Sequence, residues 1–222
     1  ELRELIGAAH RAAGEELRRP IKPEQLARLL DALEVDGKPE LHLAVGMVGL
    51  FGLRPAELAV LRVDDGGHLK VGADVKRNRC SMKRPKAERL ALPLDIPGRD
   101  GEGARILQLF DTKLVKLPPR ILTTIERGDF KPVGEAFRKL LERYPYWQSL
   151  AAANPGLTPY SLRHGYAWRG HKAYDRSLSV RDLAALMGHT PAVHLQNYGK
   201  WTDEQGLIEA VQGLTRQTST TP

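Results

Sequence analysis

The chain has 222 residues, 41% of them hydrophobic, and its 34 Lys and Arg against 27 Asp and Glu give a net charge of +7. This length and composition allow a sizeable core, and the basic balance favours a polyanionic partner. The single Cys80 excludes an internal disulfide, and no Cys/His cluster has zinc spacing. The most apolar stretch, residues 41–53, is too short to cross a bilayer, and the charged N-terminus does not look like a signal peptide. We therefore expect an intracellular protein without a structural metal.

Apolar residues at helical spacing, with proline near the starts and glycine near the ends, predict a mostly helical chain. The predicted helices cover about residues 23–33, 41–52, 55–63, 103–110, 132–143, 158–174, 179–187, 191–197 and 203–214. Short glycine-punctuated segments, "VDDGGHLKVG" and "LALPL", predict two or three short strands between the third and fourth helices. The expected fold class is mainly α with a small antiparallel β-sheet (α+β).

The domain organisation follows from the absence of an internal repeat and of a clear linker. We expect one domain over residues 21–214, preceded in residues 1–20 by the connection to an upstream region. The polar tail "TRQTSTTP", residues 215–222, is expected to be disordered.

Two arginines stand where an anion could be held. Arg54 precedes a proline at a helix N-terminus, where free N–H groups and the helix dipole favour a phosphate, and Glu57 is close enough to hold it. Arg163 follows Tyr160 by three residues, so the two share a helix face, with His164 turned about 100° away. Taken singly, each of these residues is more often structural than catalytic.

A basic run occupies residues 76–89, with seven basic residues and one acidic residue. Such runs are usually solvated loops. Lys83 lies in the predicted strand-turn-strand region, where a flexible ammonium could reach a leaving oxygen.

The segment "MGHTPAVHLQNYGKW", residues 187–201, places His189 directly after a glycine and Tyr198 nine residues later. A packed helix has no evident need for this grouping. In order along the chain, the pieces are an arginine with a glutamate three later, a lysine in a small sheet, an aromatic three before a second arginine, a glycine-histidine pair and the tyrosine.

This order resembles the tyrosine recombinase (phage integrase) family, over about residues 23–214. The resemblance implies the catalytic-domain fold of that family and a site-specific recombinase or integrase. Such an enzyme cleaves and rejoins double-stranded DNA through a covalent 3′-phosphotyrosine and needs no metal, ATP or other cofactor.

The resemblance also assigns roles. Tyr198 would be the nucleophile, Arg54 and Arg163 would stabilise the transition-state charge, and His189 would donate a hydrogen bond to the phosphate. Glu57 would support the site, and Lys83, with Lys86 as second choice, would protonate the leaving 5′-oxygen. Further DNA contacts are expected from the basic run, namely from Lys76, Arg77, Arg79, Arg84 and Lys86.

One position departs from the family's pattern. The family usually has histidine where this chain has Tyr160, and tyrosine, with an ordinary pKa of about 10, is a poor general base. We expect Tyr160 to contact the phosphate and cleavage to be slower. His194, four residues before Tyr198, is expected to lie on the helix surface and not to form a zinc site with His189.

Three alternatives stay open: a type IB topoisomerase, a DNA-binding regulator that has lost catalysis, and a purely structural helical protein. The compact final segment argues against the first, and the ordered array against the last. The chemistry implies a homotetramer on synapsed DNA and a monomer or weak dimer without it. We expect a cytoplasmic, nucleoid-associated protein that does not bind membranes.

Overall fold

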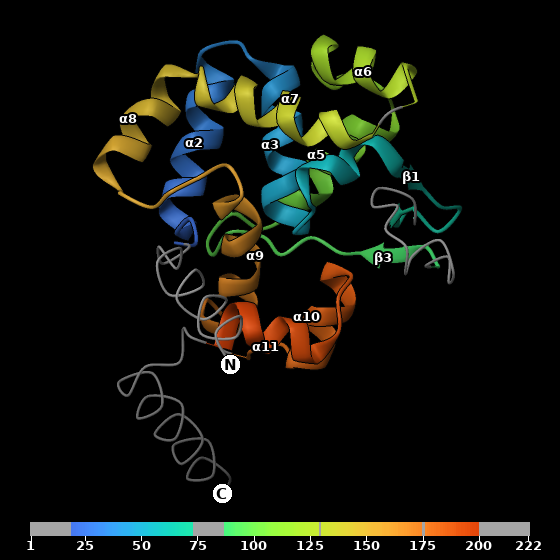
Figure 1. The fold of residues 1–222 in the computed structure, drawn as a ribbon, viewed down its shortest axis with the longest axis vertical. Helices are drawn as coiled ribbons and strands as arrows, with labels where there is room; N and C mark the ends of the chain where they lie inside the picture. The colour runs from blue at the N-terminus through green and yellow to red at the C-terminus, as the bar shows by residue number, and fades with distance from the viewer. Residues whose placement is uncertain (1–18, 73–86, 129, 175, 200–222) are drawn as a thin grey trace, which may run out of the picture.

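The computed structural model describes residues 19–72, 87–128, 130–174 and 176–199 (Figure 1). The helices in this part of the chain are α2 (Pro23–Val35), α3 (Pro39–Phe51), the 3₁₀ helix η1 (Pro55–Val60), α5 (Glu102–Asp111), α6 (Pro119–Glu126), α7 (Lys131–Glu142), α8 (Pro145–Ala153), α9 (Ser161–Lys172), α10 (Val180–Met187) and α11 (Pro191–Tyr198). The strands β1 (Leu61–Val63), β2 (Leu69–Val71) and β3 (Arg89–Ala91) form an antiparallel sheet in that order. The predicted class, mainly α with a small antiparallel sheet, is confirmed. None of the described helices has both the length and the apolar composition that crossing a membrane requires.

Helix α3 is the centre of the larger hydrophobic core. Its sequence is almost entirely apolar, and every residue from His42 to Phe51 is buried. Helix α2 packs against it through leucines that recur on one helical face, Leu26, Leu29, Leu30 and Leu33. Helix α3 ends at Gly52, whose φ is +62° and where a Cβ would lie 2.5 Å from the ring of Tyr166. Only glycine fits this turn without strain.

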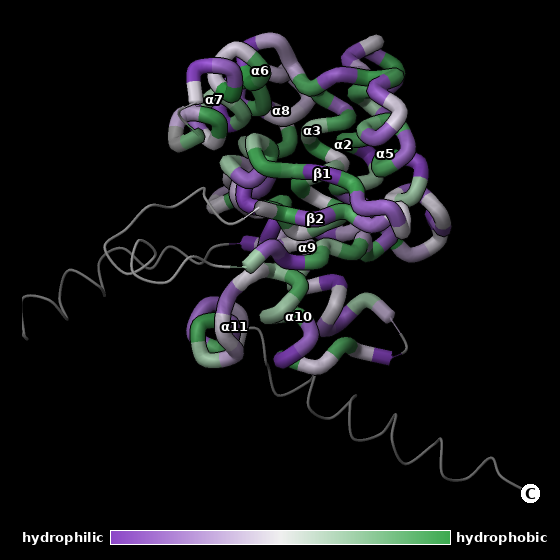
Figure 2. The backbone as a smooth tube through the Cα atoms, turned by 90° about the vertical axis from the view of Figure 1, so that its right-hand side faces the viewer, coloured by the Kyte–Doolittle hydropathy of each residue, from purple (hydrophilic) through white to green (hydrophobic). Residues whose placement is uncertain are grey.

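The small sheet lies beside this core. Leu61 of β1 pairs with Val71 of β2, and Leu69 pairs with Ala91 of β3. Leu69 and Val71 are buried while Lys70 between them is on the other face, as strand alternation requires. Figure 2 shows β1 and β2 lying across the side of the molecule, between the level of α3 and that of α9.

A second, smaller core joins α9, α10 and α11, at the bottom of Figure 1. Its buried members are Tyr166, Ala167, Leu183, Met187 and Tyr198. Helix α9 also sends Leu162 into the larger core, so this helix connects the two. The candidate site lies where they meet.

Seven predicted helices are confirmed, with bounds shifted by at most about three residues. These are the helices predicted over 23–33, 41–52, 103–110, 132–143, 158–174, 179–187 and 191–197. The helix predicted over 55–63 begins as expected, as the 3₁₀ helix η1, but it ends at Val60, and the next three residues pair with β2 as strand β1. Helices α6 (8 residues) and α8 (9 residues) were not predicted, because both are short and each has only one buried position, Ile121 and Trp147.

Several expectations fall on residues outside the described part of the chain. They concern the connection in residues 1–20, apart from its last two residues, the helix over 203–214 and the tail. The predicted domain bounds therefore stay predictions.

Candidate active site

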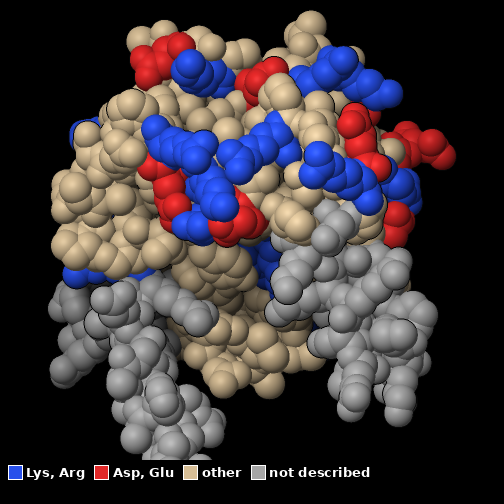
Figure 3. Space-filling model, turned by 45° about the horizontal axis from the view of Figure 1, so that its top comes forward, with Lys and Arg blue, Asp and Glu red and all other residues tan. Residues whose placement is uncertain are grey.

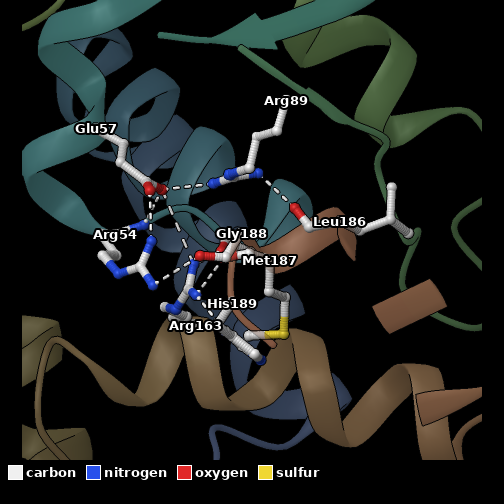
Figure 4. A network of polar contacts seen from close by, with 9 residues as sticks. Arg54, Glu57, Arg89, Arg163, Leu186, Met187, Gly188 and His189 are labelled. Atoms are coloured by element: carbon white, nitrogen blue, oxygen red, sulfur yellow. Dashed lines mark hydrogen bonds and ion pairs between the residues drawn. The ribbon is translucent and has the colours of Figure 1, made fainter. Parts of the chain in front are cut away.

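A buried carboxylate, that of Glu57 in η1, is surrounded by three guanidinium groups (Figure 4). Its Oε1 accepts a hydrogen bond from Arg54 Nη1 at 2.7 Å, and its Oε2 accepts one from Arg89 Nη2 at 2.6 Å. Arg163 Nη1 lies 3.9 Å from Oε2. Burial alone would raise the pKa of Glu57, but the three arginines outweigh it and hold the pKa below its ordinary value. Three cations against one carboxylate leave an excess of positive charge, which favours an anion.

Arg54 is the accessible member of this group. It is the N-cap of η1 in an extended conformation, and its backbone N–H donates to Glu57 at 2.7 Å. The side chain is 32% exposed, and its Nη2 donates to the carbonyl of Gly188 at 3.3 Å. Burial lowers the pKa of Arg54, whereas the adjacent Glu57 raises it more, so the net shift is upward. Arg54 can therefore present a permanent charge to an incoming phosphate.

Arg163, in α9, is 1% exposed and ties two helix ends together. Its Nη1 donates to the carbonyl of Gly52 after α3, and its Nη2 donates to the carbonyl of Met187 at 2.6 Å. The same Nη2 is 3.3 Å from His189 Nδ1. A phosphate would contact Arg163 only after the pocket rearranges.

His189 is placed by the turn at the end of α10. Gly188 has a φ of +68°, and a Cβ there would lie 2.5 Å from Arg89 Nε, so the chain turns tightly beside the arginines. Burial and then the charge of Arg163 lower the pKa of His189 to about 3. The imidazole is therefore neutral near physiological pH.

Tyr198 is the last residue of α11, and its side chain is 5% exposed. Its ring centroid lies 4.6 Å from that of His194, 5.5 Å from that of His164 and 5.9 Å from that of His189. Burial raises the pKa of Tyr198, and the charge of Arg163 opposes that rise only in part. The hydroxyl is therefore a neutral phenol that needs a base before it can act as a nucleophile.

The structure brings together five of the residues predicted from the sequence, namely Arg54, Glu57, Arg163, His189 and Tyr198. Tyr160, the N-cap of α9, is 38% exposed and lies at the edge, with its ring 5.0 Å from that of His164. The predicted proton donor Lys83 lies outside the described residues. So do the predicted DNA contacts Lys76, Arg77, Arg79, Arg84 and Lys86.

Two expectations about histidines are wrong. His194 was expected on the helix surface, but it is 1% exposed, because it lies on the side of α11 that packs against α9. His164 was expected to turn away from Tyr160 and Arg163. Its ring instead lies edge-on to both Tyr160 and Tyr198.

Arg89 was counted only as part of the basic run. Its partner Glu57 is 32 residues away, and its other guanidinium nitrogen donates to the carbonyl of Leu186. Burial lowers the pKa of Arg89 although Glu57 opposes this. No local pattern in the sequence distinguishes this arginine from its basic neighbours.

The described surface does not form an unbroken basic face on the side that Figure 3 draws, where Lys and Arg lie beside Asp and Glu. Helix α7 is an example of such mixing, since Arg138 contacts both Glu135 and Glu142.

Comparison with known proteins gives one distant similarity. The chain is 28% identical over 173 residues to Excisase A from Nostoc sp. (strain PCC 7120 / SAG 25.82 / UTEX 2576), a match that covers 78% of this chain and 34% of that protein. The chain thus spans about a third of the length of this relative. No family model matches the chain, and no solved structure matches it.

Proposed function

We propose that the protein cleaves and rejoins DNA strands in site-specific recombination, with Tyr198 as the nucleophile. The observation that carries this proposal is the convergence of Tyr198, His189, Arg163 and Arg54, from four separate segments, around an excess of positive charge. A phenol beside fixed guanidinium groups suits attack on a phosphodiester. The similarity to a protein named Excisase A supports the same kind of role.

In the proposed reaction Tyr198 Oη attacks the scissile phosphorus, a phosphorus–oxygen bond forms, and the bond to the 5′-oxygen breaks. The 3′-phosphotyrosine conserves the bond energy, so a 5′-hydroxyl can later reverse the step without ATP. Arg54 would contact the non-bridging oxygens first, and Arg163 would do so once the pocket rearranges. Lys83 stays the expected donor of a proton to the 5′-oxygen.

Covalent capture tests the proposal. A nicked duplex from the native flanking sequence, or a randomised pool, traps the adduct because the short 5′ fragment is lost after cleavage. On denaturing gels we expect a DNA-protein adduct with the wild type and with Tyr146→Phe, a half-buried tyrosine outside the site, and none with Tyr198→Phe. An adduct with Tyr198→Phe would assign the nucleophile to another residue.

The same samples separate the rival functions. Salt-sensitive DNA binding without any adduct would favour a DNA-binding regulator over an enzyme. Relaxation of a supercoiled plasmid without strand exchange would favour a topoisomerase. Strand exchange between two duplexes would require several protomers, and we propose a homotetramer on synapsed DNA.

A further inference from the structure

Three histidines near Tyr198 are connected by hydrogen bonds between their rings. His189 Nε2 is 2.8 Å from His194 Nδ1, and His194 Nε2 is 2.8 Å from His171 Nε2. They come from the loop after α10, from α11 and from α9. His194 is 1% exposed, and its ring lies against that of Tyr198. The proposed reaction assigns no role to His194 or His171.

The direction of these hydrogen bonds follows from the arginine at the inner end. A guanidinium only donates, so His189 Nδ1 accepts from Arg163 and the imidazole proton of His189 is on Nε2. That proton is donated to His194 Nδ1, which places the proton of His194 on Nε2. His194 in turn donates to His171 Nε2, so His171 carries its proton on Nδ1.

The surroundings keep the two inner rings neutral. Arg163, Arg54 and Arg89 face His189, and burial and these charges lower its pKa to about 3. Burial, His171 and Arg163 lower the pKa of His194 to about 4.

At the outer end, burial and Lys172 lower the pKa of the half-buried His171. Neutral imidazole rings place one proton in each of the two 2.8 Å contacts, so each contact is a hydrogen bond. Among the described residues, no three His, Cys, Asp or Glu side chains are arranged to hold a metal ion.

Attack by Tyr198 releases a phenolic proton that must go to a base. Tyr160, at the position where the resemblance implies histidine, is a poor base. The ring centroids of Tyr198 and His189 lie 5.9 Å apart, and Arg163, whose charge opposes the rise in the pKa of Tyr198, lies 3.3 Å from His189 Nδ1.

We propose that His189, His194 and His171 form a proton relay that carries the phenolic proton of Tyr198 away from the site, an inference that rests on the proposed function. As the bond from Tyr198 Oη to phosphorus forms, Arg163 turns from His189 Nδ1 to the phosphate, and the phenolic proton of Tyr198 moves to the Nδ1 atom that is freed. The Nε2 proton of His189 moves to His194 Nδ1, and the Nε2 proton of His194 moves to His171 Nε2. His171 becomes the imidazolium and releases a proton to solvent. Religation runs the same transfers in reverse.

Nuclear magnetic resonance of ¹⁵N-histidine-labelled protein without DNA tests the proton positions independently of any reaction. At pH 7 we expect the proton on Nε2 in His189, on Nε2 in His194 and on Nδ1 in His171. Long-range proton-nitrogen correlations report these tautomers directly. A proton on Nδ1 of His189, or an imidazolium at His194, would overturn the relay.

A pair of variants separates proton transfer from ring positioning. In His194→Asn the side-chain oxygen can still accept from His189 near the Nδ1 position, but an amide does not pass a proton on to His171. His194→Leu removes both functions. Leu195→Ala, at a 55% exposed position on the same helix, is the control and should cleave like the wild type.

We expect His194→Asn and His194→Leu to slow single-turnover adduct formation equally, by about 100-fold or more near pH 7. The deficit should shrink as pH rises, because hydroxide can then accept the phenolic proton. Thermal unfolding identifies a variant that fails to fold, and His194→Asn is the more conservative of the two.

Wild-type cleavage by His194→Asn at every pH would overturn the relay while leaving the proposed function intact. Absence of an adduct with the wild type would count against the proposed function instead. The tautomers measured without DNA would still decide whether the relay exists.

Discussion

Glu57 is the residue on which the charge balance of the site depends. Its buried carboxylate is contacted by Arg54 and Arg89, and Arg163 is next to it. Glu57→Gln would leave three guanidinium groups together without their counter-charge, and we expect a loss of about 2 to 4 kcal/mol in the free energy of unfolding. Urea titration followed by circular dichroism measures it.

The matched control is Glu135→Gln on the surface of α7, which breaks exposed ion pairs with Arg138 and Lys139. Exposed pairs contribute little to stability, so this variant should unfold almost like the wild type. Equal urea midpoints for Glu57→Gln and Glu135→Gln would show that the buried carboxylate does not hold the arginines together.

The sequence indicates those site residues whose relation is local. Arg54 and Glu57 are three apart, and a helix start brings them together. The contacts of Arg89 and His171 span 32 and 23 residues, and only the packing of β3 near η1 and of α9 against α11 creates them. His194 was noticed because of its spacing from Tyr198, yet spacing alone does not tell a surface histidine from a buried one.

At the scale of elements, the turn from α10 into α11 positions the last two predicted catalytic side chains. Helix α10 ends at Gly188, and the hydroxyl of Thr190 accepts from the backbone of Val193 to start α11. His189 lies between these two caps, and Tyr198 ends the second helix. The rigid corner thus fixes both the histidine and the tyrosine.

Gly188→Ala tests this corner. Alanine at a φ of +68° is strained, and its Cβ would meet Arg89 Nε at 2.5 Å, which pushes Arg89 off Glu57 and Leu186. Gly98→Ala is the control, because its φ is +79° but no atom lies within 4 Å of the added Cβ. We expect Gly98→Ala to cost about 1 kcal/mol and Gly188→Ala clearly more, measured by thermal unfolding. Equal costs would mean that Arg89 moves freely.

The sequence predicted most of the helices and missed the short helices α6 and α8. Helices α2 and α10 have buried positions at helical spacing and were predicted. Segment 55–63 has the composition of a helix, but pairing with β2 takes its last three residues, and sheet pairing is a tertiary effect. Tertiary contacts of this kind are not encoded in a local window.

At the scale of the molecule, the site lies between two hydrophobic cores that share α9. Arg163 on this helix binds carbonyls at the ends of α3 and α10, so it connects both cores across the site. Loss of packing in the smaller core would therefore move His189 and Tyr198 relative to Arg54. A substitution that loosens the smaller core should therefore lower the free energy of unfolding and disturb the geometry of the site at the same time.

The pH dependence of stability reports the neutral histidines of the relay. His189 and His194 have lowered pKa values of about 3 and about 4, whereas histidines in the unfolded chain titrate near the model value of 6.5. Below about pH 6.5 the unfolded chain takes up protons that the folded protein does not, so the free energy of unfolding falls as pH falls toward 4. Each histidine contributes at most about 1.4 kcal/mol per pH unit.

Urea midpoints between pH 7.5 and 4.5 measure this slope. His194→Asn removes one of the histidines whose pKa is lowered in the folded protein and should flatten the slope. Leu195→Ala, at an exposed position of the same helix without a titrating group, should keep the wild-type slope. Parallel curves for all three proteins would mean that His194 is not held neutral in the folded state.

Glu57 adds a separate loss of stability at lower pH. Its pKa in the folded protein is below the unfolded value of 4.5, so the ionised carboxylate stabilises the folded protein above that pH. This contribution to the free energy of unfolding disappears as further acidification protonates the folded protein.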